Sequence, residues 1–247
     1  MRRLLPVAVV VLAAGCGGGS APVASEAPRQ ADFVAQAEPT PAPAAKKPAG
    51  PRFKTARVLH RTTLRAAPGG HVIARVDRKT EFGSRRVLAV TGRRGGWLRV
   101  IASERRNEQR GWIRARAVRL GATDISIHVD RSARRLVLKR GSKVLRRMPI
   151  AVGRPGNETP LGRFAVTDRL RTGRADSPYG CCAVALSGHQ TKLVPGWPGG
   201  DRLAIHGTPN PETVGTEASL GCMRAYDADI RALMRRVPLG APVFIRA

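Results

Sequence analysis

Short segments in which apolar and polar residues alternate dominate the second half of the chain. Ile125, Ile127 and Val129 stand at every second position, the spacing of a strand that is buried on one face. Further apolar positions follow two turn-forming clusters, at 130–132 and 141–142. These positions are Leu136, Leu138, Val144, Met148, Ile150 and Val152. We expect a meander of antiparallel strands in this region.

One helix is predicted near the end of the chain. Its apolar residues recur at i, i+3, i+4 and i+7, which places them on one helical face. They are Ile230, Leu233, Met234 and Val237. Asp227 is expected to cap the helix and Pro238 to end it, and a last strand is expected over 242–245. The C-terminal region therefore combines mostly strands with one short helix.

A separate group of short strands is expected over 51–120. The apolar segments are 71–76, 86–90, 97–101, 111–114 and 117–120, with Gly-rich turn clusters between them. Short strands at this spacing predict a small barrel. The stretches TTLRAAPGG, GGWLRVI and RGWIRARAVRL resemble a bacterial SH3-like domain. That resemblance implies a module that assists wall binding or acts as a spacer.

Aromatic residues make up only 4% of the sequence, so the core must rest mainly on Val, Leu, Ile and Ala. Trp97 and Trp112 both lie in apolar strand segments, and we expect them to pack in a core. Stacking of either ring on a ligand is the alternative, because a fold alone does not fix a function.

The first 16 residues have the organisation of an export signal. Arg2 and Arg3 precede a short apolar stretch, 4–14, and LAAGC ends at Cys16. This ending resembles the lipobox of bacterial lipoproteins, although Ala13 stands where that motif usually has Leu. The resemblance implies lipidation of Cys16 and an anchor in the outer face of the cytoplasmic membrane. An ordinary cleaved secretory signal is the alternative, and both interpretations export the chain.

Residues 17–50 are rich in Ala and Pro and have no regular apolar period, so we interpret them as a disordered linker. The charges of this linker cancel. The formal net charge of +27, from 44 Lys and Arg against 17 Asp and Glu in 247 residues, therefore belongs mainly to the rest of the chain. After the export signal, no apolar run approaches the roughly 20 residues that a membrane span requires.

A strongly basic chain first suggests a nucleic-acid partner, but export argues against one. Outside a bacterial membrane the abundant polyanions are lipid headgroups and anionic wall polymers, which a basic protein attracts in a salt-dependent manner. The alternative is that the Arg and Ala content reflects only the composition of the source genome.

The residues with the clearest chemistry lie in LAIHGTPNPETVGTEASLGCMR. Cysteine nucleophiles need a nearby imidazole to take the proton and backbone N–H groups to stabilise the oxyanion. His206 follows a short strand and Cys222 comes 16 residues later, next to Gly221. By spacing alone, a buried inert cysteine and a structural histidine remain an alternative.

The motifs around these two residues favour the catalytic interpretation over the structural one. IHGT, SLGCMR and the upstream AVGRPGNETPLGRF resemble the L,D-transpeptidase catalytic domain, the YkuD family, over 123–247. SPYGCCAVALSGHQ is similar to the stretch that leads to the histidine of that family. The resemblance implies a β-sandwich-like catalytic domain. Many members have a second histidine before the Gly-Cys pair, where this chain has Leu220.

The resemblance also implies the role of each site residue. Cys222 would be the nucleophile and His206 the general base and acid, oriented by the backbone carbonyl of Gly207. Backbone N–H groups of Gly221 and Cys222 would stabilise the oxyanion. Ser219 and Arg224 would bind the substrate.

The implied reaction is acyl transfer on peptidoglycan stem peptides. A thioester forms on the cysteine when D-Ala leaves a tetrapeptide stem, and an amine of a second stem then forms a 3-3 cross-link. With water as the acceptor, the same intermediate makes the enzyme an L,D-carboxypeptidase. A catalytically silent wall-binding lipoprotein is a further alternative. No cofactor or metal is expected.

Two adjacent cysteines, Cys181 and Cys182, lack the spacing of a zinc site. We expect one to be buried and the other to face outward. A redox link from either cysteine to Cys222, which would silence the enzyme, is a second hypothesis. His189 lies outside the motif and is expected to be a surface or structural residue.

Overall fold

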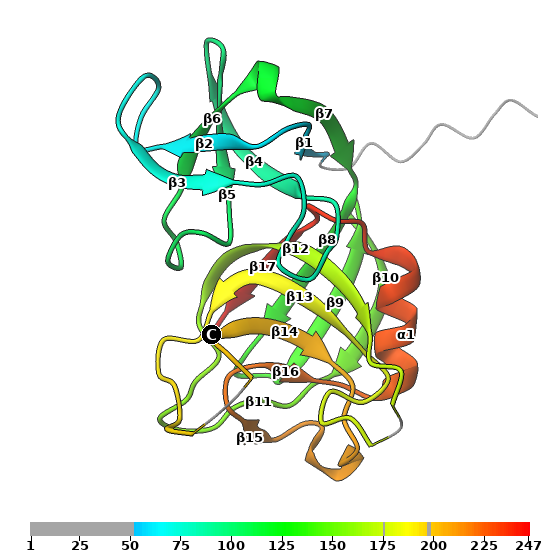
Figure 1. The fold of residues 1–247 in the computed structure, drawn as a ribbon. Helices are drawn as coiled ribbons and strands as arrows, with labels where there is room; N and C mark the ends of the chain where they lie inside the picture. The colour runs from blue at the N-terminus through cyan, green and yellow to red at the C-terminus, as the bar shows by residue number, and fades with distance from the viewer. Residues whose placement is uncertain (1–51, 175, 197–198) are drawn as a thin grey trace, which may run out of the picture. The chain divides into compact units, whose positions relative to one another are not determined.

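The computed structural model describes residues 52–174, 176–196 and 199–247. The signal peptide, the lipidation site Cys16 and the linker, all expected within 1–50, lie outside the described residues. The described part of the chain is mainly β structure, as predicted, with one α-helix (Figure 1). None of its helices has both the length and the apolar character that a membrane span requires.

The N-terminal strands form one seven-stranded sheet in the order β3-β2-β6-β5-β4-β1-β7. Their bounds are β1 (Phe53–Val58), β2 (Thr62–Arg65), β3 (Val72–Val76), β4 (Val87–Arg94), β5 (Trp97–Ile101), β6 (Gly111–Arg114) and β7 (Val118–Thr123), with a 3-10 turn at Ala115–Ala117. The five predicted segments are β3 to β7. The pattern did not indicate β1 or β2. In β2 the only apolar residue is Leu64.

Small aliphatic side chains fill the core of this sheet, as the low aromatic content predicts. Leu64 packs so closely on β6 that a Cβ at Gly111 would lie 2.2 Å from its Cγ. Trp97 is buried and its ring is covered by the Arg114 guanidinium, 4.1 Å from the ring centroid. Trp112 is half-buried. The relation of this sheet to SH3-like domains stays a prediction.

The C-terminal strands form an eight-stranded sheet in the order β10-β9-β8-β17-β12-β13-β14-β16 and a parallel pair, β11 and β15. Their bounds are β8 (Ile125–Asp130), β9 (Arg135–Arg140), β10 (Lys143–Pro149), β11 (Val152–Gly153), β12 (Gly162–Arg171), β13 (Cys182–His189), β14 (Arg202–His206), β15 (Glu217–Ser219), β16 (Met223–Arg224) and β17 (Pro242–Arg246). The predicted antiparallel meander is β8-β9-β10. The last strand, β17, inserts parallel to β8 and antiparallel to β12, which the sequence pattern did not indicate.

The predicted helix is α1 (Asp227–Arg236), which contacts β13 and β14 and contributes Ile230 and Leu233 to the core. The expected capping by Asp227 is wrong. Tyr226 is the N-cap residue and makes no side-chain cap, and Asp227 is the first helical residue. Its carboxylate instead accepts a hydrogen bond from the backbone N–H of Cys181 at 3.1 Å. The helix is thereby tied to the segment that leads into β13.

Candidate active site

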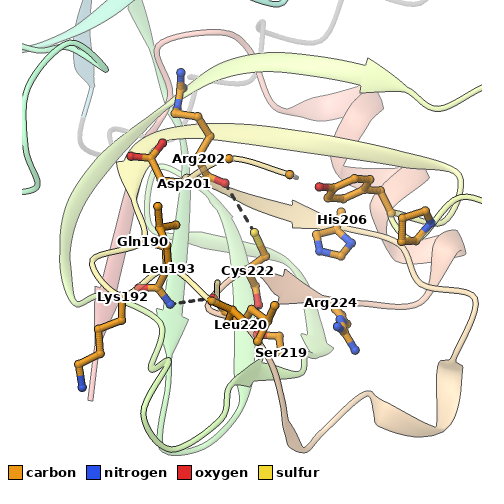
Figure 2. A pocket seen from close by; sticks show the side chains of 15 residues that line it. Gln190, Lys192, Leu193, Asp201, Arg202, His206, Ser219, Leu220, Cys222 and Arg224 are labelled. Carbon is orange, nitrogen blue, oxygen red and sulfur yellow. Dashed lines mark hydrogen bonds between the residues drawn. The ribbon is translucent and has the colours of Figure 1, made fainter. Parts of the chain in front are cut away.

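His206 and Cys222 come together because β14 and β16 are parallel neighbours. Ile205 pairs with Met223 and His206 with Arg224, so the end of one strand lies beside the start of the other. Cys222 precedes β16 directly, and both His206 and Cys222 line the same pocket. Figure 2 shows the imidazole beside the thiol. The structure thus brings together the two residues that the sequence predicts as catalytic.

The imidazole of His206 is held in one orientation. Its side chain is buried, and Nδ1 lies 2.6 Å from the carbonyl oxygen of Gly207. Because that oxygen can only accept, Nδ1 carries the hydrogen and Nε2 keeps its lone pair. Burial lowers the pKa of His206 to about 4, with a smaller lowering contribution from Arg224. His206 is therefore a neutral base near pH 7.

Asp227 explains why a glycine follows His206. A Cβ at Gly207 would lie 2.0 Å from Oδ1 of Asp227, and a Cβ at Gly180 would lie 2.3 Å from the same oxygen. The first residue of α1 thus packs directly on the turn that supplies the His206-orienting carbonyl. Tyr179 adds an edge-on ring contact to His206, with 5.0 Å between ring centroids. The sequence analysis assigned neither Asp227 nor Tyr179 to the site.

The thiol of Cys222 is neutral at rest. Burial raises its pKa above the usual range, although a backbone hydrogen bond from Ala204 and the charge of Arg224 act in the opposite direction. The thiol donates a weak hydrogen bond to the carbonyl oxygen of Arg202, with 3.7 Å between sulfur and oxygen (Figure 2). The resting pair is therefore a thiol and a neutral imidazole rather than a thiolate and an imidazolium.

This protonation state predicts slow alkylation of Cys222 at neutral pH. With iodoacetamide, the rate per thiol at pH 7 to 8 is expected to be below that of N-acetylcysteine, because only the thiolate reacts and burial disfavours it. Intact-mass spectrometry with peptide mapping follows the reaction. A rate that is high and constant from pH 5 to 8 would instead demonstrate a preformed thiolate–imidazolium pair.

The turn before Cys222 differs from the expectation in one respect. The N–H of Gly221, expected to face the pocket as an oxyanion donor, donates to the hydroxyl of Ser219 at 3.0 Å. That hydroxyl in turn donates to the carbonyl oxygen of Cys222 at 2.5 Å. Ser219 lines the pocket but is only 1% exposed, and its hydroxyl makes both of these hydrogen bonds within the turn. The arrangement leaves the N–H of Cys222 as the predicted oxyanion donor of this turn.

Gln190, just after β13, is a further site residue that the sequence analysis did not single out. Its Nε2 donates to the carbonyl oxygen of Leu220 at 2.7 Å (Figure 2). It also donates to the carbonyl oxygen of Asn157 at 3.0 Å. Gly221 has φ +117°, and a Cβ there would lie 2.1 Å from the same nitrogen. Both the backbone conformation and the close approach of Gln190 therefore require glycine at this position. A lone glutamine in a loop carries no sequence signal for this role.

Arg224 is half-buried and lines the pocket. Figure 2 shows its side chain on the same side of the pocket as His206, whereas Gln190 and Lys192 lie on the other side of Cys222. Lys192 adds a second cationic side chain to the lining, whereas the guanidinium of Arg202, another lining residue, is paired with the carboxylate of Glu81. Asp201 supplies the one carboxylate among the lining residues. The pocket therefore favours an anionic ligand.

The expectation for the two adjacent cysteines was wrong. Cys181 and Cys182 are bonded to each other, and Cys222 is the free cysteine of the described residues. The two were expected to be separate thiols, one buried and one facing outward, and the hypothesis of a link to Cys222 is not what the structure shows. His189 has a structural contact, as expected, because its Nδ1 lies 2.9 Å from a carboxylate oxygen of Asp201.

Comparisons with known proteins show what the segment that carries this site is similar to. Residues 124–245 match the family model of the L,D-transpeptidase catalytic domain, YkuD. The YkuD protein of Bacillus subtilis (strain 168) is 33% identical over 119 residues, which cover 48% of this chain and 64% of that protein. The YkuD protein of Bacillus licheniformis is 31% identical with the same coverage. The chain thus matches less than two thirds of the length of these relatives.

Among solved structures, an L,D-transpeptidase from Mycobacterium smegmatis is 14% identical, with a TM-score of 0.42, and the match covers 66% of this chain and 91% of that one. The family model covers the segment in which His206 and Cys222 meet. Residues 124–245 are therefore similar to the L,D-transpeptidase catalytic domain of the YkuD family.

Proposed function

We propose that this protein is a peptidoglycan L,D-transpeptidase that forms 3-3 cross-links through a thioester on Cys222. The observation that carries the proposal is the meeting of a free thiol with an imidazole of fixed tautomer in one pocket of a segment that matches the YkuD family model. Nucleophile, base and orienting group then have the order that acyl transfer requires.

In the first half-reaction, Nε2 of His206 takes the proton of the Cys222 thiol while sulfur attacks the carbonyl carbon between the third residue and the terminal D-Ala of a tetrapeptide stem. Because both groups are neutral at rest, the thiol proton passes to His206 before or during the attack. The C–N bond then breaks, the amine of D-Ala takes the proton from His206, and a thioester remains on the enzyme.

In the second half-reaction, a side-chain amine of another stem attacks the thioester carbon, and His206 again accepts a proton. The C–S bond breaks and the thiol is regenerated, so the cycle needs no cofactor. If water is the acceptor, the products are a tripeptide stem and free enzyme, which is L,D-carboxypeptidase activity. We place Arg224, beside His206 in the pocket, in contact with the stem peptide.

The test is incubation of the protein with a disaccharide-tetrapeptide as both donor and acceptor, followed by mass spectrometry. Loss of D-Ala, an adduct on Cys222 and a dimer linked between third residues support the proposal. Loss of D-Ala with only tripeptide product supports the carboxypeptidase. The absence of any adduct, with retained binding to isolated walls, supports the silent wall-binding lipoprotein and overturns the enzyme.

We further propose that the chain is exported and held at the membrane by lipidation of Cys16, with the 51–120 module as an SH3-like spacer or wall-binding unit. The formal net charge of +27 supports contact with anionic wall polymers. Such contact is salt-dependent, so binding of the protein to isolated walls should weaken between 50 and 500 mM NaCl.

The pH profile of the reaction gives an independent prediction. Because burial lowers the pKa of His206 to about 4, the acid limb of kcat/KM is expected near pH 4 to 5 rather than near the usual histidine value of about 6.5. Steady-state rates of D-Ala release at pH 4 to 8 measure this limb. A limb centred at 6 to 7 would contradict the buried neutral imidazole.

A further inference from the structure

Thr159 holds the peptide unit that joins Gly221 to Cys222. Its side chain is 0% exposed, and Oγ1 donates a hydrogen bond to the carbonyl oxygen of Gly221 at 2.8 Å. Oγ1 of Thr159 also accepts a hydrogen bond from the backbone N–H of Gly153 at 2.9 Å. Because an N–H group can only donate, the hydroxyl hydrogen of Thr159 is committed to Gly221.

This contact fixes the direction of the Cys222 N–H. In a trans peptide the C=O and N–H groups point to opposite sides, and the described residues contain no cis peptide. The carbonyl of Gly221 points to the buried Thr159, so the N–H of Cys222 points away from it. No acceptor for this N–H is found among the hydrogen bonds of the described residues.

The neighbouring peptide is held by different groups. The carbonyl of Leu220 accepts from Gln190, and the N–H of Gly221 donates to Ser219. In the two peptide units that join Leu220, Gly221 and Cys222, the N–H of Cys222 is thus the group for which the described residues offer no hydrogen-bond partner. A backbone donor that is fixed in direction and free of an internal acceptor is what an oxyanion site requires.

We propose that Thr159 is a positioning residue that orients the Gly221–Cys222 peptide so that the Cys222 N–H stabilises the oxyanion. This inference rests on the proposed function of Cys222 as an acyl-transfer nucleophile, and it gives that mechanism a group outside the His206–Cys222 pair. The Thr159 hydroxyl acts through the peptide and does not touch the substrate.

The loop that carries Thr159 is built to make this contact. A Cβ at Gly153 would lie 2.1 Å from the carbonyl oxygen of Asn157, so the backbone folds back on itself between β11 and Thr159. Loss of the hydroxyl would leave the Gly221 carbonyl and the Gly153 N–H unpaired in a buried place, which is costly. The Gly221–Cys222 peptide is then free to rotate to find another donor.

The experiment compares Thr159→Val, which keeps the shape and loses the hydroxyl, with Thr159→Ser, which keeps the hydroxyl. Two reactions of Cys222 are measured in each protein: acylation by p-nitrophenyl acetate and alkylation by iodoacetamide. Acylation passes through an oxyanion, whereas alkylation of the thiol does not. Both reagents lack peptidoglycan, so the result stands even if the stem-peptide test of the proposed function fails.

Thr159→Val is expected to slow acylation about 10- to 100-fold, since loss of one oxyanion donor costs about 10²–10³. Alkylation should change less than about twofold, and Thr159→Ser should restore acylation. Equal loss of both reactions, or no loss of either, overturns the proposal. If Thr159→Val does not fold by circular dichroism, Thr159→Ala replaces it, and wild-type acylation by a folded Thr159→Ala protein also overturns it.

Discussion

Replacement of Cys222 by alanine is expected to abolish both the covalent adduct and the release of D-Ala, with a fall in rate of more than roughly 10⁴-fold. Cys222 is the free cysteine of the described residues, and the Cys181–Cys182 disulfide has no thiol to offer. The free energy of unfolding should change by only about 1 kcal/mol, because the change removes one small side-chain atom. Mass spectrometry measures the first effect and urea denaturation the second.

Cys222→Ser is the matched control for the Cys222→Ala variant. It keeps a polar side chain of similar size, but a hydroxyl beside a neutral imidazole is a much weaker nucleophile than a thiol. Both variants should therefore fold and both should be inactive. Global unfolding of either variant would instead identify a structural thiol, and D-Ala release by Cys222→Ala would remove Cys222 from the mechanism.

The sequence predicts those parts of the fold that local periodicity determines. The alternation at Ile125, Ile127 and Val129 gives β8, and the i, i+3, i+4, i+7 pattern gives α1. The insertion of β17 beside β8 could not be predicted, because it pairs residues more than 100 positions apart and its apolar segment is compatible with any neighbour. The capping prediction for Asp227 failed because a tertiary contact with Cys181 takes the carboxylate.

In the candidate site, too, the sequence predicts the residues that carry local motifs but not those that act through tertiary contacts. Family motifs identify His206, Gly207 and Cys222, and the structure places the Gly207 carbonyl against the imidazole. The contact of Ser219 with the Gly221 N–H depends on the conformation of one turn, and sequence spacing contains no information on it. The contribution of Thr159 likewise comes from a loop 62 residues away from Gly221 that meets the turn only in the folded protein.

Replacement of His206 by glutamine is expected to lower kcat/KM for D-Ala release by roughly 10²- to 10⁴-fold, the range for loss of a general base. Glutamine is polar and neutral, as His206 is at pH 7, but it cannot accept the thiol proton. Because Cys222 is protonated at rest, no thiolate is available to compensate at neutral pH. Raising the pH should therefore restore the variant in part, and a variant rate that stays flat from pH 7 to 10 would contradict the base role.

Stability gives a second readout of His206 that does not depend on activity. The folded protein binds a proton at His206 only near pH 4, whereas the unfolded chain binds it near the usual value of about 6.5. The stabilising contribution of the neutral imidazole is therefore complete above about pH 6.5 and is lost as the pH falls toward 4, by up to about 3 kcal/mol. Glutamine does not titrate, so His206→Gln should show a shallower loss of unfolding free energy between pH 7 and 4. Parallel curves for the two proteins in urea denaturation would show that the imidazole is solvated rather than buried beside Cys222.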